Sequence, residues 1–241
     1  MKKIDRRRRY YIVLDVETAG DLDNPLVYDI GYAVTDKHGN IYETRSFIIS
    51  EIFYNKSLMT SAYYSEKIPK YEEDIKNGTR KVVTFAEMRL DFIALALKYD
   101  VKVIAAYKLM FDTRALTNTI RFIEKNERLK FLPYELKDIE MLCIWCLACE
   151  NLYTQVSFRN MAINNGWITK AGNFKTSAEI GYRFLTGDVD FTEKHTGLED
   201  VLIEIKIMAY ALRQNKKRIG GVFENPWRIP NSKKLNKKVF K

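Results

Sequence analysis

Two acidic side chains end an apolar stretch near the N-terminus. Asp15 and Glu17 follow residues 10–14, which are aromatic, β-branched or leucine. Such a stretch predicts a buried strand, and residues two apart in a strand point to the same side. Two buried carboxylates repel each other and lose hydration, so they need a partner, and a divalent metal ion is the obvious one. The alternative is that the strand has ended and both acids are solvated, and this motif alone does not decide between them.

A third acid follows a second apolar stretch. Residues 101–106 predict a short buried strand, and Asp112 lies at the start of the helix expected after it. An acid at this place suits the helix dipole, so a plain N-cap is the alternative to a site residue.

A histidine and a fourth acid surround the start of the last long helix. Thr196 and Glu199 fit a capping box, which predicts Thr196 as the N-cap. His195 then lies just outside the helix and can face the same cleft as Asp200, whereas residues five apart within a helix point about 140° apart. The other histidine, His38, lies in a predicted turn and is expected to be solvated.

The pattern of apolar residues predicts one α/β domain. Residues 36–40 form a hairpin turn between the second and third strands. Residues 50–80 contain helical pieces without predicted bounds. The expected strands are 10–16, 27–35, 41–49, 101–106 and 136–138, and the expected helices are 84–99, 112–125, 139–149, one capped near Thr176 and Glu179, and 197–214.

Composition restricts the class of protein. Of the 241 residues, 46% are hydrophobic and 29% are charged, and no apolar run approaches the roughly 20 residues that span a bilayer. The apolar stretch after the basic N-terminus is too short for a signal peptide. We therefore expect a cytoplasmic protein without a membrane partner. An odd number of cysteines fits a reducing compartment.

The cysteines have C-x2-C-x2-C spacing, which is also found in iron–sulfur proteins. Cys143, Cys146 and Cys149 lack a fourth nearby ligand and lie in an apolar run. Free cysteine usually behaves as a small buried hydrophobe, so core packing is favoured.

Positive charge is concentrated at the two ends of the chain. The net charge is +9, yet residues 1–9 carry six Lys/Arg and one Asp, and residues 216–241 carry nine Lys/Arg and one Glu. The sequence therefore predicts a basic N-terminal arm (1–9), a catalytic domain (10–215) and a basic C-terminal tail (216–241). Basic segments commonly contact nucleic-acid phosphates, and the alternative is that they only aid solubility.

Taken together, the acidic motifs resemble those of a known enzyme family. Asp15 and Glu17, Asp112 after Phe111, and His195 with Asp200 stand in the order of the three motifs of the DnaQ-like 3′–5′ exonucleases of the DEDDh branch. The resemblance covers about residues 10–213. It implies a ribonuclease H-like α/β fold, in which an antiparallel meander of three strands and further parallel strands form a mixed sheet flanked by helices.

The resemblance also implies the role of each residue. Four carboxylates would hold two Mg2+ or Mn2+ ions, which stabilise charge on the attacking and leaving oxygens of a phosphodiester. Asp15 would bridge both ions, Glu17 and Asp200 would complete one site, and Asp112 would serve the other. His195 would be the general base, because a histidine pKa lies near neutrality.

Two positions depart from the family pattern. The family usually has N-x-x-F-D in its second motif, and Lys108 replaces that Asn; Ala19 follows Thr18 where the family has Gly or Thr. Thr18, Lys108 and Phe111 are expected to contact substrate, with Lys108 either on a phosphate or facing elsewhere.

The function implied is a 3′–5′ exonuclease that releases nucleoside 5′-monophosphates from single-stranded 3′ ends, with DNA favoured over RNA. A bacterial or phage-infected host cytosol fits it, and homodimers and replication or repair proteins are partners known in such a family. The alternatives are an RNA-trimming enzyme of this family and a non-catalytic nucleic-acid-binding module. Tyr63, Tyr64 and Tyr71 either stack on bases or cover a sheet edge, and the second is favoured.

Overall fold

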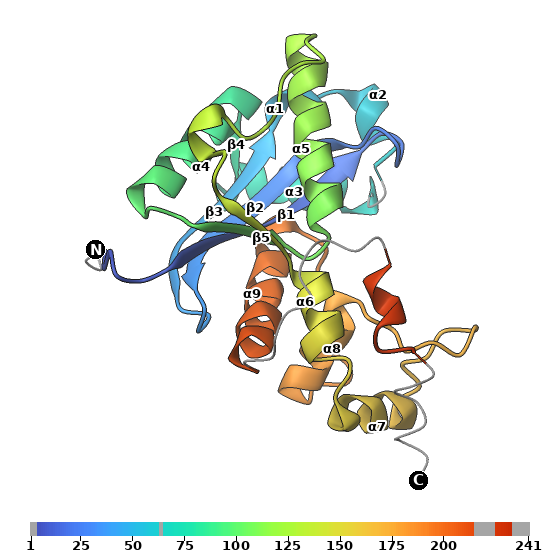
Figure 1. The fold of residues 1–241 in the computed structure, drawn as a ribbon. Coiled ribbons are helices and arrows are strands. Elements are labelled where there is room, and N and C mark those ends of the chain that lie inside the picture. Colours follow the sequence, from blue (N-terminus) through green and yellow to red (C-terminus); the bar gives the residue numbers. More distant parts are fainter. Residues whose placement is uncertain (1–3, 63–64, 215–224, 233–241) are drawn as a thin grey trace.

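The computed structural model describes residues 4–62, 65–214 and 225–232. Within these residues a mixed sheet has the strand order β4-β3-β2-β1-β5-β6 (Figure 1). The first three strands form an antiparallel meander, and the other pairs are parallel. This is the mixed sheet that the sequence predicts. The strands are β1 (Tyr10–Ala19), β2 (Leu26–Asp36), β3 (Ile41–Ile49), β4 (Lys81–Val83), β5 (Val103–Ala106) and β6 (Glu140–Cys143).

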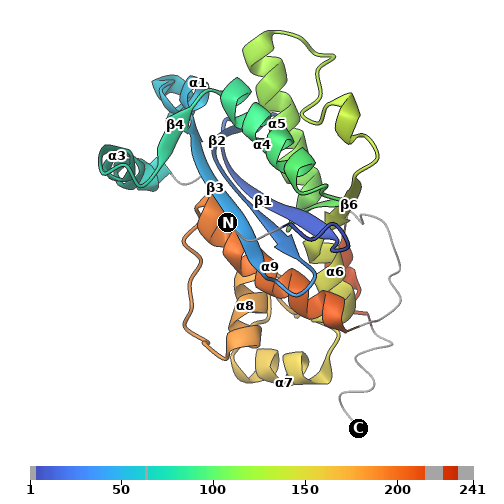
Figure 2. The same cartoon turned by 90° about the vertical axis from the view of Figure 1, so that its left-hand side faces the viewer.

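Helices cover both faces of the sheet, as two views at right angles show (Figures 1 and 2). On β1, Ile12 and Leu14 face one hydrophobic core, and Tyr11 and Val13 face the other. The first core is covered by α4 (Phe85–Lys98) and α5 (Leu109–Glu124). The second is covered by α6 (Ile144–Asn151), α7 (Val156–Asn164), α8 (Ala178–Thr186) and α9 (Gly197–Arg213). The shorter helices are α1 (Ser50–Phe53), α2 (Lys56–Met59) and α3 (Ile68–Lys76), with 3-10 turns at Ser65–Lys67, Tyr134–Leu136 and Pro226–Arg228.

Several predicted elements are confirmed. β3 has the predicted bounds, and α4 begins after a complete capping box of Thr84 and Glu87. The hairpin between β2 and β3 is present, and His38 in it is exposed. No helix in the described part of the chain is both long and apolar enough to cross a bilayer.

The region between α5 and α6 was predicted wrongly. The expected strand 136–138 is instead the end of a 3-10 turn at Leu136 and the turn that follows it, and the expected helix 139–149 contains β6 in its first half. β6 pairs in parallel with β5, from Val103 opposite Glu140 to Ala106 opposite Cys143. This pairing outweighs the helical preference of an apolar run, because strand formation depends on the neighbouring strand.

Two helix starts also differ from prediction. α5 begins at Leu109 after Lys108, so Asp112 lies within the first turns and is not an N-cap. α8 is capped by Ser177, whose side chain accepts from the backbone N–H of Ile180, and not by Thr176. The strand β4 was not predicted at all.

Two glycines allow α9 to approach the sheet at backbone distance. A Cβ added at Gly31 of β2 would lie 2.1 Å from the backbone nitrogen of Leu198, and one added at Gly197 would lie 2.4 Å from the nitrogen of Gly31. Gly31 pairs with Asp15 across β1 and β2. The first turn of α9 therefore contacts the sheet beside Asp15.

We expect Gly31→Ala to lower the free energy of unfolding by about 3 kcal/mol, because the new Cβ meets backbone atoms that cannot move aside cheaply. Gly172→Ala is the control: nothing lies within 4 Å of its added Cβ, and its φ is +79°, so its cost is only that of a positive φ, about 1 kcal/mol. Urea unfolding of both variants measures the difference. Equal losses would contradict the steric explanation.

Candidate active site

The acids predicted from sequence meet at one end of β1. Asp15 and Glu17 continue the alternation of Tyr11 and Val13, so they point to the face of the sheet that α9 covers. Asp112 comes from the first turns of α5 and Asp200 from those of α9. One cleft of about 450 Å³ is lined by all eight predicted site residues: Asp15, Glu17, Thr18, Lys108, Phe111, Asp112, His195 and Asp200.

Two more carboxylates line this cleft and were missed. Glu204 lies one turn after Asp200 on α9, is 2% exposed, and accepts a hydrogen bond from the backbone N–H of Tyr107 at 3.2 Å. Glu193 lies in the loop before His195. The i,i+4 spacing of Glu204 and Asp200 was the available signal, because residues four apart share a helix face.

Burial raises the pKa of every carboxyl group in the cluster. The pKa rises to about 8 for Glu17 and Asp112 and to about 7 for Asp200. Burial also raises the pKa of Asp15 well above its ordinary value, and nearby carboxylates, Glu204 first, raise it further. Without a cation the cluster therefore retains protons near neutral pH, which a bound metal ion would displace.

His195 is held beside these acids in an unusual backbone conformation. Its φ is +51°, in the left-handed region. The ammonium of Lys67 donates to the carbonyl oxygens of Lys194 and His195, the latter at 3.3 Å. The imidazole Nδ1 lies 3.9 Å from carboxylate oxygens of both Glu193 and Asp200. Burial, followed by the charge of Lys67, lowers the pKa of His195, which favours a neutral imidazole that can accept a proton.

A buried aspartate fixes the start of α9. Asp29 pairs with Glu17 across β1 and β2, and its carboxylate accepts hydrogen bonds from the backbone N–H of Gly197 at 3.1 Å and the hydroxyl of Tyr71 at 2.8 Å. The guanidinium of Arg80 forms an ion pair with the same carboxylate at 3.2 Å. Burial raises the pKa of Asp29, and these three donors oppose that shift.

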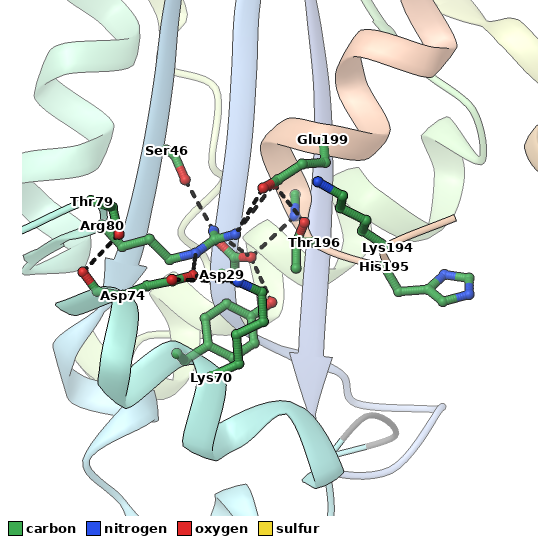
Figure 3. Close-up of polar contacts among 12 residues, drawn as sticks. Asp29, Ser46, Lys70, Asp74, Thr79, Arg80, Lys194, His195, Thr196 and Glu199 are labelled. Atoms are coloured by element: carbon green, nitrogen blue, oxygen red, sulfur yellow. Dashed lines mark hydrogen bonds and ion pairs between the residues drawn. The ribbon is translucent and has the colours of Figure 1, made fainter. Parts of the chain in front are cut away.

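Arg80 joins this aspartate to two further acids (Figure 3). It also contacts Asp74 at 3.1 Å and Glu199 at 3.2 Å, and only 5% of its side chain is exposed. Tyr71 lies under the guanidinium, 4.9 Å from ring centroid to Cζ, and is 1% exposed. Base stacking by Tyr71 is thereby contradicted, whereas Tyr63 and Tyr64 lie outside the described residues.

The capping box predicted for α9 is only half correct. Thr196 stands at the N-cap, but its side chain caps no backbone N–H; its hydroxyl donates to the carboxylate of Glu199 instead. That carboxylate is turned toward Arg80. The ion pair therefore takes the place of the reciprocal cap.

The donor atoms suit a divalent cation. Glu17, His195 and Asp200 each offer one ligand atom, and these atoms lie within 4.8 Å of one another. The Oδ1 atom of Asp200 is buried without a hydrogen-bond partner in the described part of the chain. A buried carboxylate oxygen that lacks a donor is costly unless a cation neutralises it.

The cysteines do not belong to this site. Cys143 and Cys146 pack in the core under α4 and α5, and Cys149 packs in the core under α9. All three are buried, as core packing predicts.

Comparison with known proteins identifies the fold. No protein-family model and no curated protein sequence matches the chain. Among solved structures it is similar to E. coli exonuclease I in a zinc-bound complex with single-stranded DNA (TM-score 0.50, 14% identity, 87% of this chain and 41% of that one). Complexes of the same enzyme with 5cy-dT13 (0.53, 15%, 87% and 41%) and with dA16 (0.54, 13%, 86% and 42%) are also similar.

The chain spans about two fifths of the length of these structures. At such low identity the likeness concerns the fold. It confirms the predicted ribonuclease H-like architecture, with a mixed sheet flanked by helices, as the fold of this chain.

Proposed function

We propose that this protein is a metal-dependent 3′–5′ exonuclease of the DEDDh type, which releases nucleoside 5′-monophosphates from nucleic-acid 3′ ends, DNA in preference to RNA. One observation carries the proposal: four carboxylates and a histidine from β1, α5 and the start of α9 line a single cleft. The fold that E. coli exonuclease I shares supports it, and so does the single-stranded DNA in the complexes of that enzyme.

In this proposal the carboxylates hold two Mg2+ or Mn2+ ions. Asp15, which lies among the other acids, would serve both ions; Glu17 and Asp200 would complete one site, and Asp112 would serve the other. When bound, such ions stabilise negative charge on the attacking and leaving oxygens of the phosphodiester. The unpartnered oxygen of Asp200 is the feature of this chain that most directly calls for a cation.

His195 is the proposed general base. Its lowered pKa keeps the imidazole neutral at physiological pH, so it can take a proton from the attacking water. The bonds from Lys67 to the carbonyls of Lys194 and His195 hold this loop in place. Positioning by a fixed loop contributes to rate because the base need not be oriented during the reaction.

The substrate would contact Thr18, Lys108 and Phe111 at the rim of the cleft. Lys108 is exposed at the N-cap of α5, where its ammonium can reach a phosphate directly. We therefore propose that it binds phosphate in place of the Asn usual in the family.

The deciding assay uses end-labelled single-stranded DNA, duplex DNA and RNA, each with Mg2+, Mn2+ or chelator. Stepwise shortening from the 3′ end of DNA in the presence of metal supports the proposal. Shortening of RNA alone would identify an RNA-trimming enzyme, and binding without shortening would identify a non-catalytic module.

His195→Asn should reduce turnover about 10²- to 10⁴-fold by removing the base, with an unchanged circular dichroism spectrum. Asparagine tolerates the left-handed φ of +51°. The matched control is His38→Asn, at the exposed turn, which should retain full rate. Near-normal turnover in His195→Asn would refute the assigned role.

Asp15→Asn should abolish turnover and yet raise the melting temperature of the metal-free protein at pH 8. Burial, and then the neighbouring carboxylates, raise the pKa of Asp15 well above its ordinary value, so the folded metal-free chain must keep a proton on a carboxyl group that ionises in the unfolded chain. Asparagine removes this cost because it is neutral in both states. Differential scanning calorimetry with EDTA measures the second effect. A lower melting temperature than wild type would show that Asp15 is not under repulsion.

The stabilisation by Mg2+ should increase with pH. The carboxyl pKa values of Glu17 and Asp112 rise to about 8 in the folded chain, from about 4 in the unfolded chain. The folded metal-free protein therefore binds more protons, so its stability falls as pH rises from about 4 to 8. A Mg2+ concentration of 100 times the Kd at pH 8.5 should add about 2.7 kcal/mol at that pH, and the same concentration should add less at pH 6, where protons compete for the carboxylates. Thermal scans at pH 6 and pH 8.5 should show the larger shift at pH 8.5, and the reverse order would contradict the site.

A further inference from the structure

A second groove lies beside the proposed active site. It has a volume of about 820 Å³ and is lined by the outer face of α5 and by Trp145 at the start of α6. Lys108 and Phe111 line both this groove and the active-site cleft, so the two hollows share a rim. Figure 1 shows α5 alongside the sheet, with α6 below its lower end. We call this hollow the α5 groove.

One stripe of α5 faces the α5 groove. Phe111, Arg114, Asn118 and Arg121 are spaced at i, i+3, i+7 and i+10, and all four line it. From Lys108 to Arg121 the helix rises about 20 Å at 1.5 Å per residue. A stacked single strand advances 3.4 Å per nucleotide, so this length corresponds to about six nucleotides.

The arginines of this stripe are oriented by backbone carbonyl oxygens and form no ion pair with an acid among the described residues. Arg114 donates to the carbonyl oxygen of Leu22 at 3.1 Å, and Arg121 donates from Nε to that of Leu129 at 2.9 Å. None of the ion pairs found among the described residues includes Lys108, Arg114 or Arg121. Arg80, by contrast, contacts three acids. Guanidinium groups that are oriented by carbonyls and lack an acidic partner suit phosphate.

The walls between these cations are aromatic and apolar. The guanidinium of Arg114 lies 5.8 Å from the ring centroid of Phe111. Trp145 is fixed by a hydrogen bond from its Nε1 to the hydroxyl of Thr176 at 3.0 Å. Asn118 offers a buried Nδ2 donor with no hydrogen-bond partner in the described part of the chain. Aromatic faces between cations favour the bases and phosphates of a single strand over an acidic peptide.

We propose that the α5 groove binds the single-stranded nucleic acid that leads into the active site, over about six nucleotides upstream of the 3′ end. Arg114 and Arg121 contact phosphates, and Phe111 and Trp145 contact bases. The inference deepens the proposed function and rests on it for the direction of the strand. Binding in the α5 groove would make the affinity for a substrate depend on the length of the strand, although the reaction concerns only the terminal nucleotide.

Equilibrium binding tests the α5 groove without turnover. Single-stranded DNA and RNA of 2 to 12 nucleotides, labelled at the 5′ end, are titrated in EDTA at several NaCl concentrations and followed by fluorescence anisotropy. Affinity should increase up to about six nucleotides and then level off. Arg114→Gln and Arg121→Gln should each lower the slope of log affinity against log salt by about 0.7, the value for one phosphate contact on a single strand.

Two variants control for charge and for fold. Arg121→Lys keeps the charge and should keep the salt slope. Arg89 of α4 makes the same kind of bond as Arg121, from Nε to the carbonyl of Phe131 at 2.7 Å, but does not line the α5 groove. Arg89→Gln should therefore bind as wild type does. The basic termini are identical in all variants, so any contribution that they make to the salt slope is the same in each and does not affect the differences between variants.

A salt slope unchanged in Arg114→Gln would overturn the proposal, and because Arg114 is exposed this variant decides even if Arg121→Gln fails to fold. Displacement of the oligonucleotide from wild type, but not from Arg114→Gln, by an acidic peptide would also overturn it, by assigning the groove to a peptide. Groove-dependent binding without any hydrolysis by wild type would overturn the exonuclease function and leave the groove standing.

Discussion

The contact on which the rest of the site depends is the backbone approach of α9 to β2. Gly31 and Gly197 together leave no side chain between helix and strand, so the first turn of α9 lies against the residue that pairs with Asp15. Asp29, two residues before Gly31 on β2, then accepts a hydrogen bond from the backbone N–H of Gly197. A bulkier residue at either glycine would move Asp200 and the loop that carries His195 away from β1. The acids would then no longer share one cleft.

The cost of this arrangement is electrostatic. Close packing brings Glu204 and Glu193 into the cleft with the four motif acids, and burial raises the pKa of each. The fold tolerates such a cluster because carboxyl groups can bind protons when no cation is present. A cation that replaced those protons would recover this loss of stability, and the proposed metal binding would then be linked to pH and folding in one equilibrium.

The parts of the structure that were predictable from sequence are those determined by local pattern. The alternation ending at Asp15 and Glu17, and the start of α9 just after His195, both follow from short-range rules. Pairing partners are not local, so β6 was mistaken for a helix and β4 was missed. Arg80 was missed for the same reason: nothing near it in sequence shows that a loop arginine contacts Asp29 and Glu199.

Arg80 also bears on how much of the site forms without a metal ion. Its guanidinium contacts the carboxylates of Asp29 and Glu199, so the protein itself supplies a counter-ion at the start of α9. The scaffold around the cleft therefore does not need a metal ion to form. Under the proposed function, metal ions would bind reversibly to a preformed site, and the protein could be stored without cations and activated by their addition without refolding.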